Sequence, residues 1–343
     1  MHVINAENVN DAMAKGIDLI LDQGVQVESR NGMTLEVPEP VATVYKNPYQ
    51  RVLISYARDA NPFFHLMESL WILAGRQDVK FLNEFNKRMV DFSDDGKVFN
   101  APYGYRLRER FDDSGKCGFD QVAEVIAMLN RDPNSRQAVC QIWDTEDLNK
   151  DTKDKACNMS VVFRIRDSRL DMTVYNRSND MIWGAYGANA VQFSMLQEYV
   201  AAHLDIEIGT YTQVSNSFHV YTEGPGGKVF RNLLEGFQHD INPYDYVNNT
   251  IIMAHEDMGN FESDLSQFFN IYDYYGLDEV GLTNYWESDY FKYLVNPMLS
   301  VYLMHKNLGP VEASNFTGWI LADDWRIAAN GWLTTRIENR AAK

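Results

Sequence analysis

The 343-residue sequence is short of cysteine, and the cysteines it has follow no pairing pattern. The three of them, Cys117, Cys140 and Cys157, are an odd number and form no CxxC spacing. A disulfide framework and a cysteine-rich zinc site are therefore excluded, and we expect no metal. This cysteine usage is typical of a protein from a reducing compartment, so we predict a cytoplasmic location.

Long apolar runs and basic residues are also scarce. No apolar run reaches the roughly 18 residues of a membrane span, and the first residues lack the basic and apolar regions of a signal peptide. Lys and Arg total 31 against 48 Asp and Glu, which gives a net charge of −17. Such a chain repels nucleic acids, so we expect neither a nucleic-acid nor a membrane partner. A phosphate ligand would need a few arginines gathered in a local pocket.

What is present is material for a folded domain, because 45% of the residues are hydrophobic and only 23% are charged. Apolar spacing predicts helices at 9–21, 66–74, 119–130, 189–204, 296–305 and 322–334. Strand-like runs lie at 137–143, 161–165, 170–175 and 210–214, with a hairpin turn at Asp167-Ser168 and a loop at 100–104. Helices, then strands, then helices favour an α+β fold with a mixed or antiparallel sheet. We place a catalytic core at 1–227 and a helical region at 228–343 packed on the same domain.

Individual residues have two readings at this point. Cys157 stands just before a strand, where a lone cysteine is usually a small buried apolar residue, and Cys140 fits that description better still. Arg30, Arg136 and Arg177 each neighbour a serine, a pairing that suits a phosphate dianion, although a loop arginine is most often a solvated charge. Glu68 in an apolar helix is either a surface residue or a buried acid with a raised pKa.

Taken in order, these residues resemble the thymidylate synthase family. The resemblance runs from residue 29 to residue 221, with a gap between 80 and 100. The matching segments are 29–34 (arginine loop), 68–73 (glutamate helix), Tyr103-Gly104, 134–137 (inter-subunit arginine segment), 156–158 (nucleophile), 175–180, Asn189, and His219-Val220-Tyr221.

The resemblance implies a thymidylate synthase-like mixed sheet with flanking helices and a helical C-terminal extension. It implies that Cys157 adds to C6 of a deoxypyrimidine monophosphate, so that C5 attacks the one-carbon unit of 5,10-methylenetetrahydrofolate. Arg177 is expected to favour the Cys157 thiolate. Glu68, with Asp180 and Tyr103, would serve catalysis.

The same resemblance assigns the binding residues. Arg30, Arg177, Ser178 and the partner subunit's Arg136 would hold the phosphate, which requires a homodimer. The remaining assignments are Asn189 to the pyrimidine edge, His219 and Tyr221 to the sugar hydroxyl, and Asp180 and Trp71 to the folate.

The sequence departs from the synthases in ways that bear on the product. Residues 336–343 do not resemble the apolar synthase tail, and the tryptophans expected between the glutamate helix and Tyr103-Gly104 are absent. The segment Arg177-Ser178-Asn179-Asp180, with Asn179 between Ser178 and Asp180, resembles that of the phage deoxycytidylate and deoxyuridylate hydroxymethylases. After tetrahydrofolate is lost, the resemblance implies that the bound pyrimidine carries an exocyclic methylene group. We therefore predict that water, rather than hydride, reaches this methylene, which gives a hydroxymethyl instead of a methyl group. The alternatives are a true thymidylate synthase and a degenerate member that only binds nucleotide.

The base preference depends on Asn189. An Asn amide suits uracil, whereas a carboxyl at this position suits cytosine, so we predict dUMP over dCMP. One additional residue between Gly184 and Asn189 weakens the alignment there. Gln137 and Asn158 replace a family Arg and His, which changes the phosphate contacts and the surroundings of the nucleophile without removing the core chemistry.

Overall fold

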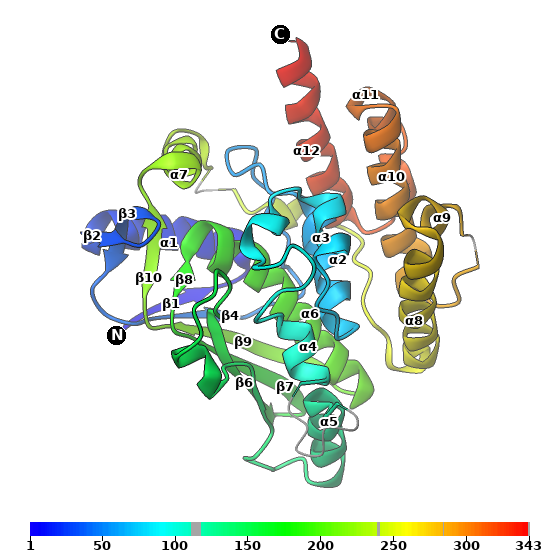
Figure 1. Cartoon of the computed structure of the whole chain (residues 1–343), viewed down its shortest axis with the longest axis horizontal. Helices are drawn as coiled ribbons and strands as arrows, with labels where there is room; N and C mark the ends of the chain where they lie inside the picture. Colours follow the sequence, from blue (N-terminus) through cyan, green and yellow to red (C-terminus); the bar gives the residue numbers. More distant parts are fainter. Residues whose placement is uncertain (111–117, 239–240, 284, 342–343) are drawn as a thin grey trace.

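The computed structural model describes residues 1–110, 118–238, 241–283 and 285–341, which form two sheets flanked by helices (Figure 1). Cys117 lies outside these residues. Parallel and antiparallel pairs occur in both sheets, and the chain does not alternate regularly between strand and helix. The predicted α+β class with a mixed sheet is confirmed.

The larger sheet has six strands in the order β1-β4-β9-β7-β6-β5. Their bounds are β1 (His2–Ala6), β4 (Val41–Tyr45), β5 (Val139–Gln141), β6 (Asn158–Arg166), β7 (Arg169–Asn176) and β9 (Glu207–Ser215). Strands β6 and β7 form the predicted hairpin, and its turn residues Asp167 and Ser168 have positive φ angles of 49° and 59°. Such a turn matches the right-handed twist of the strands it joins.

The smaller sheet has the order β2-β3-β10-β8. Its strands are β2 (Val25–Ser29), β3 (Gly32–Val37), β8 (Asn179–Asp180) and β10 (Phe218–Tyr221). The predicted turn at residues 29–32 connects β2 to β3, and Gly32 takes a φ of 114° that suits glycine. Strands β1 to β4 were not predicted. Strand β2 is exposed along most of its length, so it lacks the alternation of apolar and polar residues that marks a strand.

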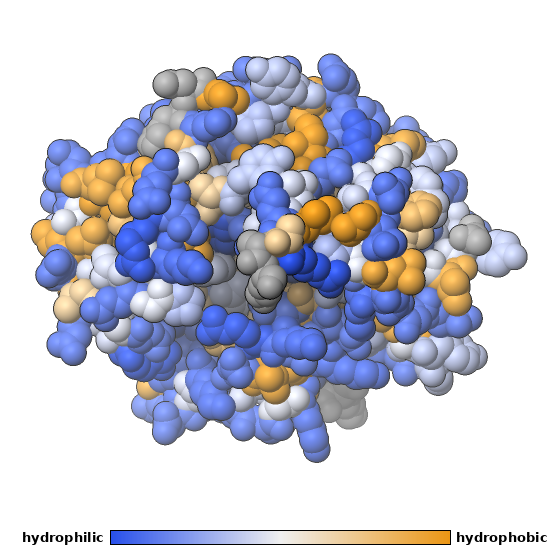
Figure 2. Space-filling model, turned by 90° about the horizontal axis from the view of Figure 1, so that it is seen from above, coloured by the Kyte–Doolittle hydropathy of each residue, from blue (hydrophilic) through white to orange (hydrophobic). Residues whose placement is uncertain are grey.

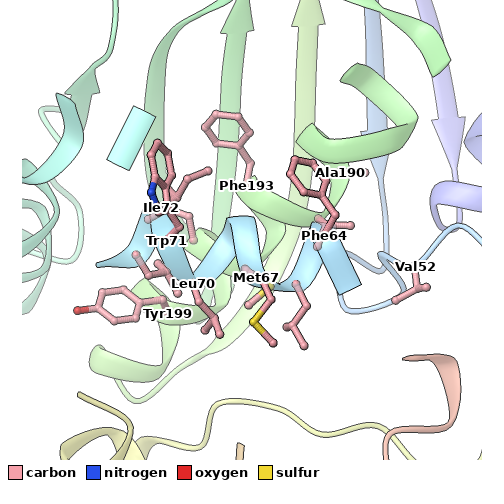
Figure 3. Packing of buried hydrophobic residues seen from close by; sticks show 14 of the residues in the cluster. Val52, Phe64, Met67, Leu70, Trp71, Ile72, Ala190, Phe193 and Tyr199 are labelled. Atoms are coloured by element: carbon pink, nitrogen blue, oxygen red, sulfur yellow. The ribbon is translucent and has the colours of Figure 1, made fainter. Parts of the chain in front are cut away.

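The helices of the first part of the chain are α1 (Val9–Gln23), α2 (Pro62–Leu73), α3 (Val79–Phe85), α4 (Tyr103–Arg108), α5 (Gln121–Arg131) and α6 (Asn189–His203). The central helix α6 lies between the larger sheet and α2 and is buried over 14 of its 15 residues. Side chains of α2, such as Met67 and Leu70, lie against α6 (Figure 3). Helix α2 begins at the Asn61 cap, whose side chain accepts from the Phe64 N–H. Tyr103 starts α4, not the predicted loop.

Only one face of the larger sheet is covered by α6. Val161, Met172 and Val174 point to that face and are fully buried. Their neighbours Val162 and Thr173 alternate to the opposite face and are partly exposed. This opposite face, which we call the outer sheet face, includes β-branched side chains such as Val162 and Thr173 that the described residues leave partly exposed.

The rest of the chain is helical: α7 (Gly224–Gly236), α8 (Met258–Tyr275), α9 (Leu277–Leu282), α10 (Asn296–Asn307), α11 (Pro310–Ser314) and α12 (Asp323–Ala341). Short helices are η1 (Met89–Phe92), η2 (Thr145–Leu148), η3 (Met181–Ala188), η4 (Pro243–Tyr246), η5 (His255–Asp257), η6 (Phe291–Val295) and η7 (Thr317–Trp319), of which η3 and η6 are π-helical.

The C-terminal helices pack on α2 through aromatic rings. The ring centroid of Phe63 lies 5.5 Å from that of Tyr302 and 5.4 Å from that of Trp332. None of the helices in the described part of the chain combines the length and apolar character that a membrane span requires. Seen from above, the surface is mainly hydrophilic, with hydrophobic residues in several separate patches (Figure 2).

Candidate active site

Cys157 and Arg177 are brought together by the β6–β7 hairpin. Cys157 directly precedes β6, and its carbonyl oxygen accepts a 2.9 Å hydrogen bond from the backbone N–H of Arg177, which follows β7. The Arg177 guanidinium donates to the carbonyls of Ala156 (2.8 Å) and Lys155 (3.0 Å). Its Nη2 lies 3.8 Å from the Cys157 Sγ. Two backbone carbonyls therefore hold a cation against the thiol.

The thiol nevertheless stays protonated without a ligand. Burial raises the pKa of Cys157, and the charges of Arg177 and Arg30 oppose this without cancelling it. The expected influence of Arg177 has the right direction, but desolvation outweighs it. Burial raises the pKa of Cys140 to about 12, and no cation contributes there. Of these two thiols, only Cys157 has cationic neighbours that can stabilise a thiolate.

Glu68 extends from α2 with a carboxyl oxygen, Oε2, that is buried and accepts no hydrogen bond. Burial raises the pKa of Glu68 to about 8, and an interaction with the Gln192 amide lowers it by less. Oε1 of Gln192, on α6, also lacks a partner. Of the two readings of Glu68, the structure supports the buried acid. At neutral pH it holds a proton that it can donate.

Tyr103 lies near both Cys157 and Glu68. Burial raises the pKa of Tyr103 well above its ordinary value, and Cys157, Asp154 and Glu68 raise it further once they are ionised. The Tyr103 ring packs 6.0 Å from the ring of Phe193 on α6. The structure thus gathers Cys157, Glu68 and Tyr103 around one point, although they come from three separate segments.

Asp180 occupies the end of β8, next to His219 on β10. Its Oδ1 accepts from the backbone N–H groups of Ile182 (2.8 Å) and Trp183 (2.7 Å), so it caps η3. Its Oδ2 is buried without a partner. Burial raises the pKa of Asp180, and His219 partly opposes this. Asp180 is a second acid with one committed and one open oxygen.

Arg30 and Tyr221 lie at the β2–β3 turn and its neighbour β10. The side-chain amide of Asn31 donates to the Tyr221 hydroxyl at 3.4 Å. Arg30 lines an open cavity of about 500 Å³ together with Asn31, Asp91, Phe92, Asp94, Asp151, Thr152 and Lys153. Arg30 lies close enough to Cys157 for its charge to lower the pKa of the thiol, while Cys157 itself does not line this cavity. Ser178 follows Arg177 and is half-buried.

Asn189 is buried at the first position of α6. The preceding segment, η3, is a π-helix with a non-helical Gly187 (φ −111°, ψ −113°). A π-helical turn is the usual way in which a helix absorbs one additional residue. The additional residue that the resemblance predicts between Gly184 and Asn189 would fit in this segment without moving the start of α6, and the alignment itself stays a prediction.

Two predicted residues lie apart from this group. Arg136 is exposed at the end of β6 opposite to Cys157, where Arg164 donates to the carbonyls of Asn134 and Ser135. The six residue-to-residue steps from Asn158 to Arg164 span roughly 20 Å of strand, so Arg136 is remote from the Cys157 of its own chain. Trp71 is 3% exposed, and its N–H donates to Asp78. Contact of Trp71 with a ligand stays a prediction.

Arg58 was not predicted from the sequence. It is 4% exposed, its guanidinium carbon lies 4.3 Å from the Trp183 ring centroid, and its Nε donates to the Ile182 carbonyl. Within the described residues, no carboxylate forms an ion pair with it, and burial lowers its pKa to about 10. The adjacent Asp59 suggests a surface ion pair, but Asp59 binds Arg336 instead, at 2.7 Å. No sequence signal revealed this buried cation.

Residues 13–293 match the thymidylate synthase family, so the chain belongs to that family. Over 225 residues it is 49% identical to the deoxyuridylate hydroxymethyltransferase of Pseudomonas phage M6. This match covers 65% of this chain and 62% of the phage protein. The protein of the same name from Bacillus phage SP01 is 43% identical over 219 residues, and this match covers 62% of this chain and 57% of the phage protein. A putative thymidylate synthase of Methanothermobacter marburgensis is 30% identical over 220 residues, and this match covers 64% of this chain and 92% of the archaeal protein.

The match is thus to less than two thirds of the length of either phage protein. The predicted family is confirmed. The site residues lie within the matched range, which extends past β10 into the helical part of the chain.

Proposed function

We propose that this chain catalyses hydroxymethylation at C5 of a deoxypyrimidine monophosphate, with dUMP preferred over dCMP. The reactants are the nucleotide, methylenetetrahydrofolate and water, and the products are the 5-hydroxymethyl nucleotide and tetrahydrofolate. The observation that carries the proposal is the pairing of a cation-flanked thiol with two partly buried acids, each of which keeps one buried oxygen without a hydrogen bond among the described residues. The names of the two phage relatives favour the same product.

Cys157 would attack C6 of the pyrimidine. Its raised pKa means that it must lose a proton when substrate binds, and Arg177 at 3.8 Å can stabilise the thiolate that results. Glu68, protonated at neutral pH, would deliver a proton to the enolate oxygen of the ring. Tyr103, close to both groups, would hold an ordered water or the ring in line.

The residues present fit the folate that the family implies. Three buried oxygens, on Glu68, Asp180 and Gln192, have no partner among the residues that the structure describes, as expected where a polar ligand completes the hydrogen bonding. Arg58 is a buried cation available to the glutamate carboxylates of a folate, and its partner Trp183 offers a half-exposed ring. When bound, methylenetetrahydrofolate supplies a one-carbon unit at the oxidation level of formaldehyde.

The phosphate would be held by Arg30, Arg177 and Ser178 of one subunit and by the partner subunit's Arg136. Two observations support a homodimer. Arg136 is exposed and roughly 20 Å from its own Cys157 along β6. The outer sheet face presents partly exposed β-branched side chains that a second copy of the chain could cover.

Mass spectrometry of the products formed from dUMP and from dCMP tests the proposal. We expect 5-hydroxymethyl-dUMP with tetrahydrofolate, and a slower reaction of dCMP. Formation of dTMP with dihydrofolate would instead establish the second candidate, a thymidylate synthase, which the 30% identity to the archaeal protein keeps open. A protein that only binds nucleotide would release no tritium from 5-tritiated dUMP.

A further inference from the structure

Behind Asn189 lies a row of buried polar side chains, which we call the amide relay: Asn189, Asn179 and Gln213. Asn189 Nδ2 donates to Asn179 Oδ1 at 3.1 Å. Asn179 Nδ2 donates to Gln213 Oε1 at 2.9 Å and to Ser215 Oγ at 3.0 Å. All three amides are at most 6% exposed, so water cannot replace these bonds readily.

The direction of every bond in the relay is determined at its inner end. Gln213 Nε2 meets the backbone carbonyl of Ala185 at 2.8 Å, and a carbonyl can only accept. Gln213 must therefore turn its Oε1 to Asn179. Asn179 must in turn present its N–H groups to Gln213 and its Oδ1 to Asn189. The Tyr45 hydroxyl closes the inner end, because it accepts from Gln213 and donates to the same carbonyl.

The relay leaves Asn189 with one available orientation. Its Nδ2 is held on the side of Asn179, and its Oδ1 makes no hydrogen bond among the described residues. The Tyr211 hydroxyl donates to the Asn189 carbonyl at 3.2 Å, which also fixes the backbone. The edge left for a ligand consists of one acceptor, Oδ1, and the second N–H of Nδ2.

This orientation matters because an asparagine amide is ambivalent between the two bases. Uracil offers an N3–H donor and an O4 acceptor, whereas cytosine offers an N3 acceptor and an amino donor. An amide that can rotate by a half-turn satisfies either edge. An amide that is held in place satisfies one and leaves unpaired groups against the other.

We propose that Asn179 and Gln213 are positioning residues that hold the Asn189 amide for the uracil edge, with Oδ1 toward N3–H and the N–H toward O4. The inference rests on the proposed function, since it concerns the same nucleotide site. It gives the asparagine in the Arg177–Asp180 segment a task of its own, separate from catalysis. Selectivity for the base then depends on Asn179, which holds the Asn189 side chain that contacts the base.

Gly184 is part of the arrangement. A Cβ on this residue would lie 2.5 Å from Asn179 Oδ1 and 3.5 Å from Asn189 Nδ2. Any side chain here would displace Asn179 from the contact with Asn189. The Gly184→Ala change therefore offers a way to disturb the relay without removing any of its hydrogen-bonding groups.

The test is the ratio of the dissociation constants for dCMP and dUMP, measured by calorimetry without folate, so that turnover is not needed. The wild type should bind dUMP more tightly. Asn179→Ala removes the acceptor of Asn189, and we expect the ratio to fall about tenfold, toward one. Gln213→Leu should reduce it in the same direction by less, and Gly184→Ala offers a third perturbation should either variant fold poorly.

Gln197→Leu is the matched control. Gln197 is a fully buried amide on α6 that bonds the carbonyls of Leu170 and Thr210, and it lies eight residues, or about 12 Å, from Asn189. Its loss should leave the ratio unchanged. An unchanged ratio in folded Asn179→Ala and Gln213→Leu, or a wild type that prefers dCMP, would overturn the relay. Failure of the proposed function is separate: the wild type would then form no hydroxymethylated product, whatever the binding ratio.

Discussion

Buried carboxyl groups occur both around Cys157 and in the C-terminal helical region, and the two regions treat them differently. Around Cys157, Glu68 and Asp180 each keep one buried oxygen without a hydrogen bond. In the C-terminal region, Asp264 accepts from the backbone N–H groups of Glu287 and Ser288 and from the Ser288 hydroxyl. Each buried acid there is tied to the segments around it.

The same holds for Asp323 and Asp324 at the start of α12. Asp323 accepts from the N–H groups of Asn248 and Asn249, and Asp324 accepts from the Tyr244 hydroxyl, which itself accepts from the Val52 N–H. Filled hydrogen bonds let these carboxyls join segments, although burial still raises the pKa of Asp324 to about 6. The open oxygens of Glu68 and Asp180 add the capacity to exchange a proton with a ligand. The difference separates stabilising acids from candidate chemical ones.

The largest expected effect is at the nucleophile. Cys157→Ser should abolish turnover, because a neutral hydroxyl is a far weaker nucleophile than a thiolate held beside Arg177. Cys140→Ser is the matched control, since that thiol is buried without a cationic neighbour, and it should keep its activity per folded molecule. Tritium release from 5-tritiated dUMP measures both. Near-normal release from Cys157→Ser would refute the adduct mechanism.

Glu68→Gln should lower kcat by about 10²-fold or more, since the amide cannot donate the proton that the carboxyl holds at neutral pH. The wild-type kcat/KM should fall as the pH rises through about 8, and the variant should lack this step. Rate measurements over a pH range of about 6 to 9.5, which brackets the Glu68 pKa of about 8, test this. A wild-type profile without that step would show that Glu68 is no proton donor.

The same variant should be more stable than the wild type at high pH. Between pH 4.5 and about 8 the unfolded carboxyl is ionised while the folded one keeps its proton. The folded state then binds more protons, so stability falls as the pH rises through this window. Thermal unfolding should show Glu68→Gln melting above the wild type beyond pH 8 and converging with it below pH 4.5. A variant that melts lower at every pH would contradict the raised pKa assigned to Glu68.

The sequence indicated the site residues well where chemistry dictates residue type and poorly where packing dictates their role. Cys157, Arg177 and Asp180 stand in short motifs, so their order along the chain was enough to name the family. Arg58 and Gln213 have no motif, because burial and a carbonyl acceptor supplied by distant segments give them their properties. Strand β2 was missed because it is exposed along most of its length and carries no apolar alternation. Strand β4 was missed for the opposite reason, because it is buried on both faces and therefore does not alternate either.

Mixing subunits tests whether the site region is complete within one chain. Arg136→Ala and Cys157→Ala should each be inactive alone. If Arg136 serves the partner, one site of a mixed dimer keeps both residues, and about a quarter of the activity should return at equal mixing, since half of the dimers are mixed with one intact site. Tritium release after proven subunit exchange is the measurement. No recovery would mean that Arg136 acts in its own subunit or not at all.

In the C-terminal region, Asp264→Ala should destabilise without touching the chemistry. The side chain is 1% exposed, and its loss strands two backbone N–H groups and a hydroxyl. We expect a loss of about 3 kcal/mol in the free energy of unfolding, with kcat per folded molecule unchanged. Denaturant titration measures it, and Asp278→Ala on the exposed side of α9 is the control. A loss of kcat in folded Asp264→Ala would remove the distinction between the two regions.

The smallest expected effect is at the point where the two regions meet. Arg336 of α12 donates to Asp59 at 2.7 Å, next to the buried Arg58. Because the pair is partly exposed, Arg336→Ala should change the unfolding free energy by only about 0.5 kcal/mol. If α12 holds the Arg58 segment in place for folate, the KM for methylenetetrahydrofolate should rise about threefold while that for dUMP stays constant. Arg340→Ala, one turn further along α12, should leave both unchanged. An equal rise for both substrates would show that α12 acts on the whole site and not on the folate side of it.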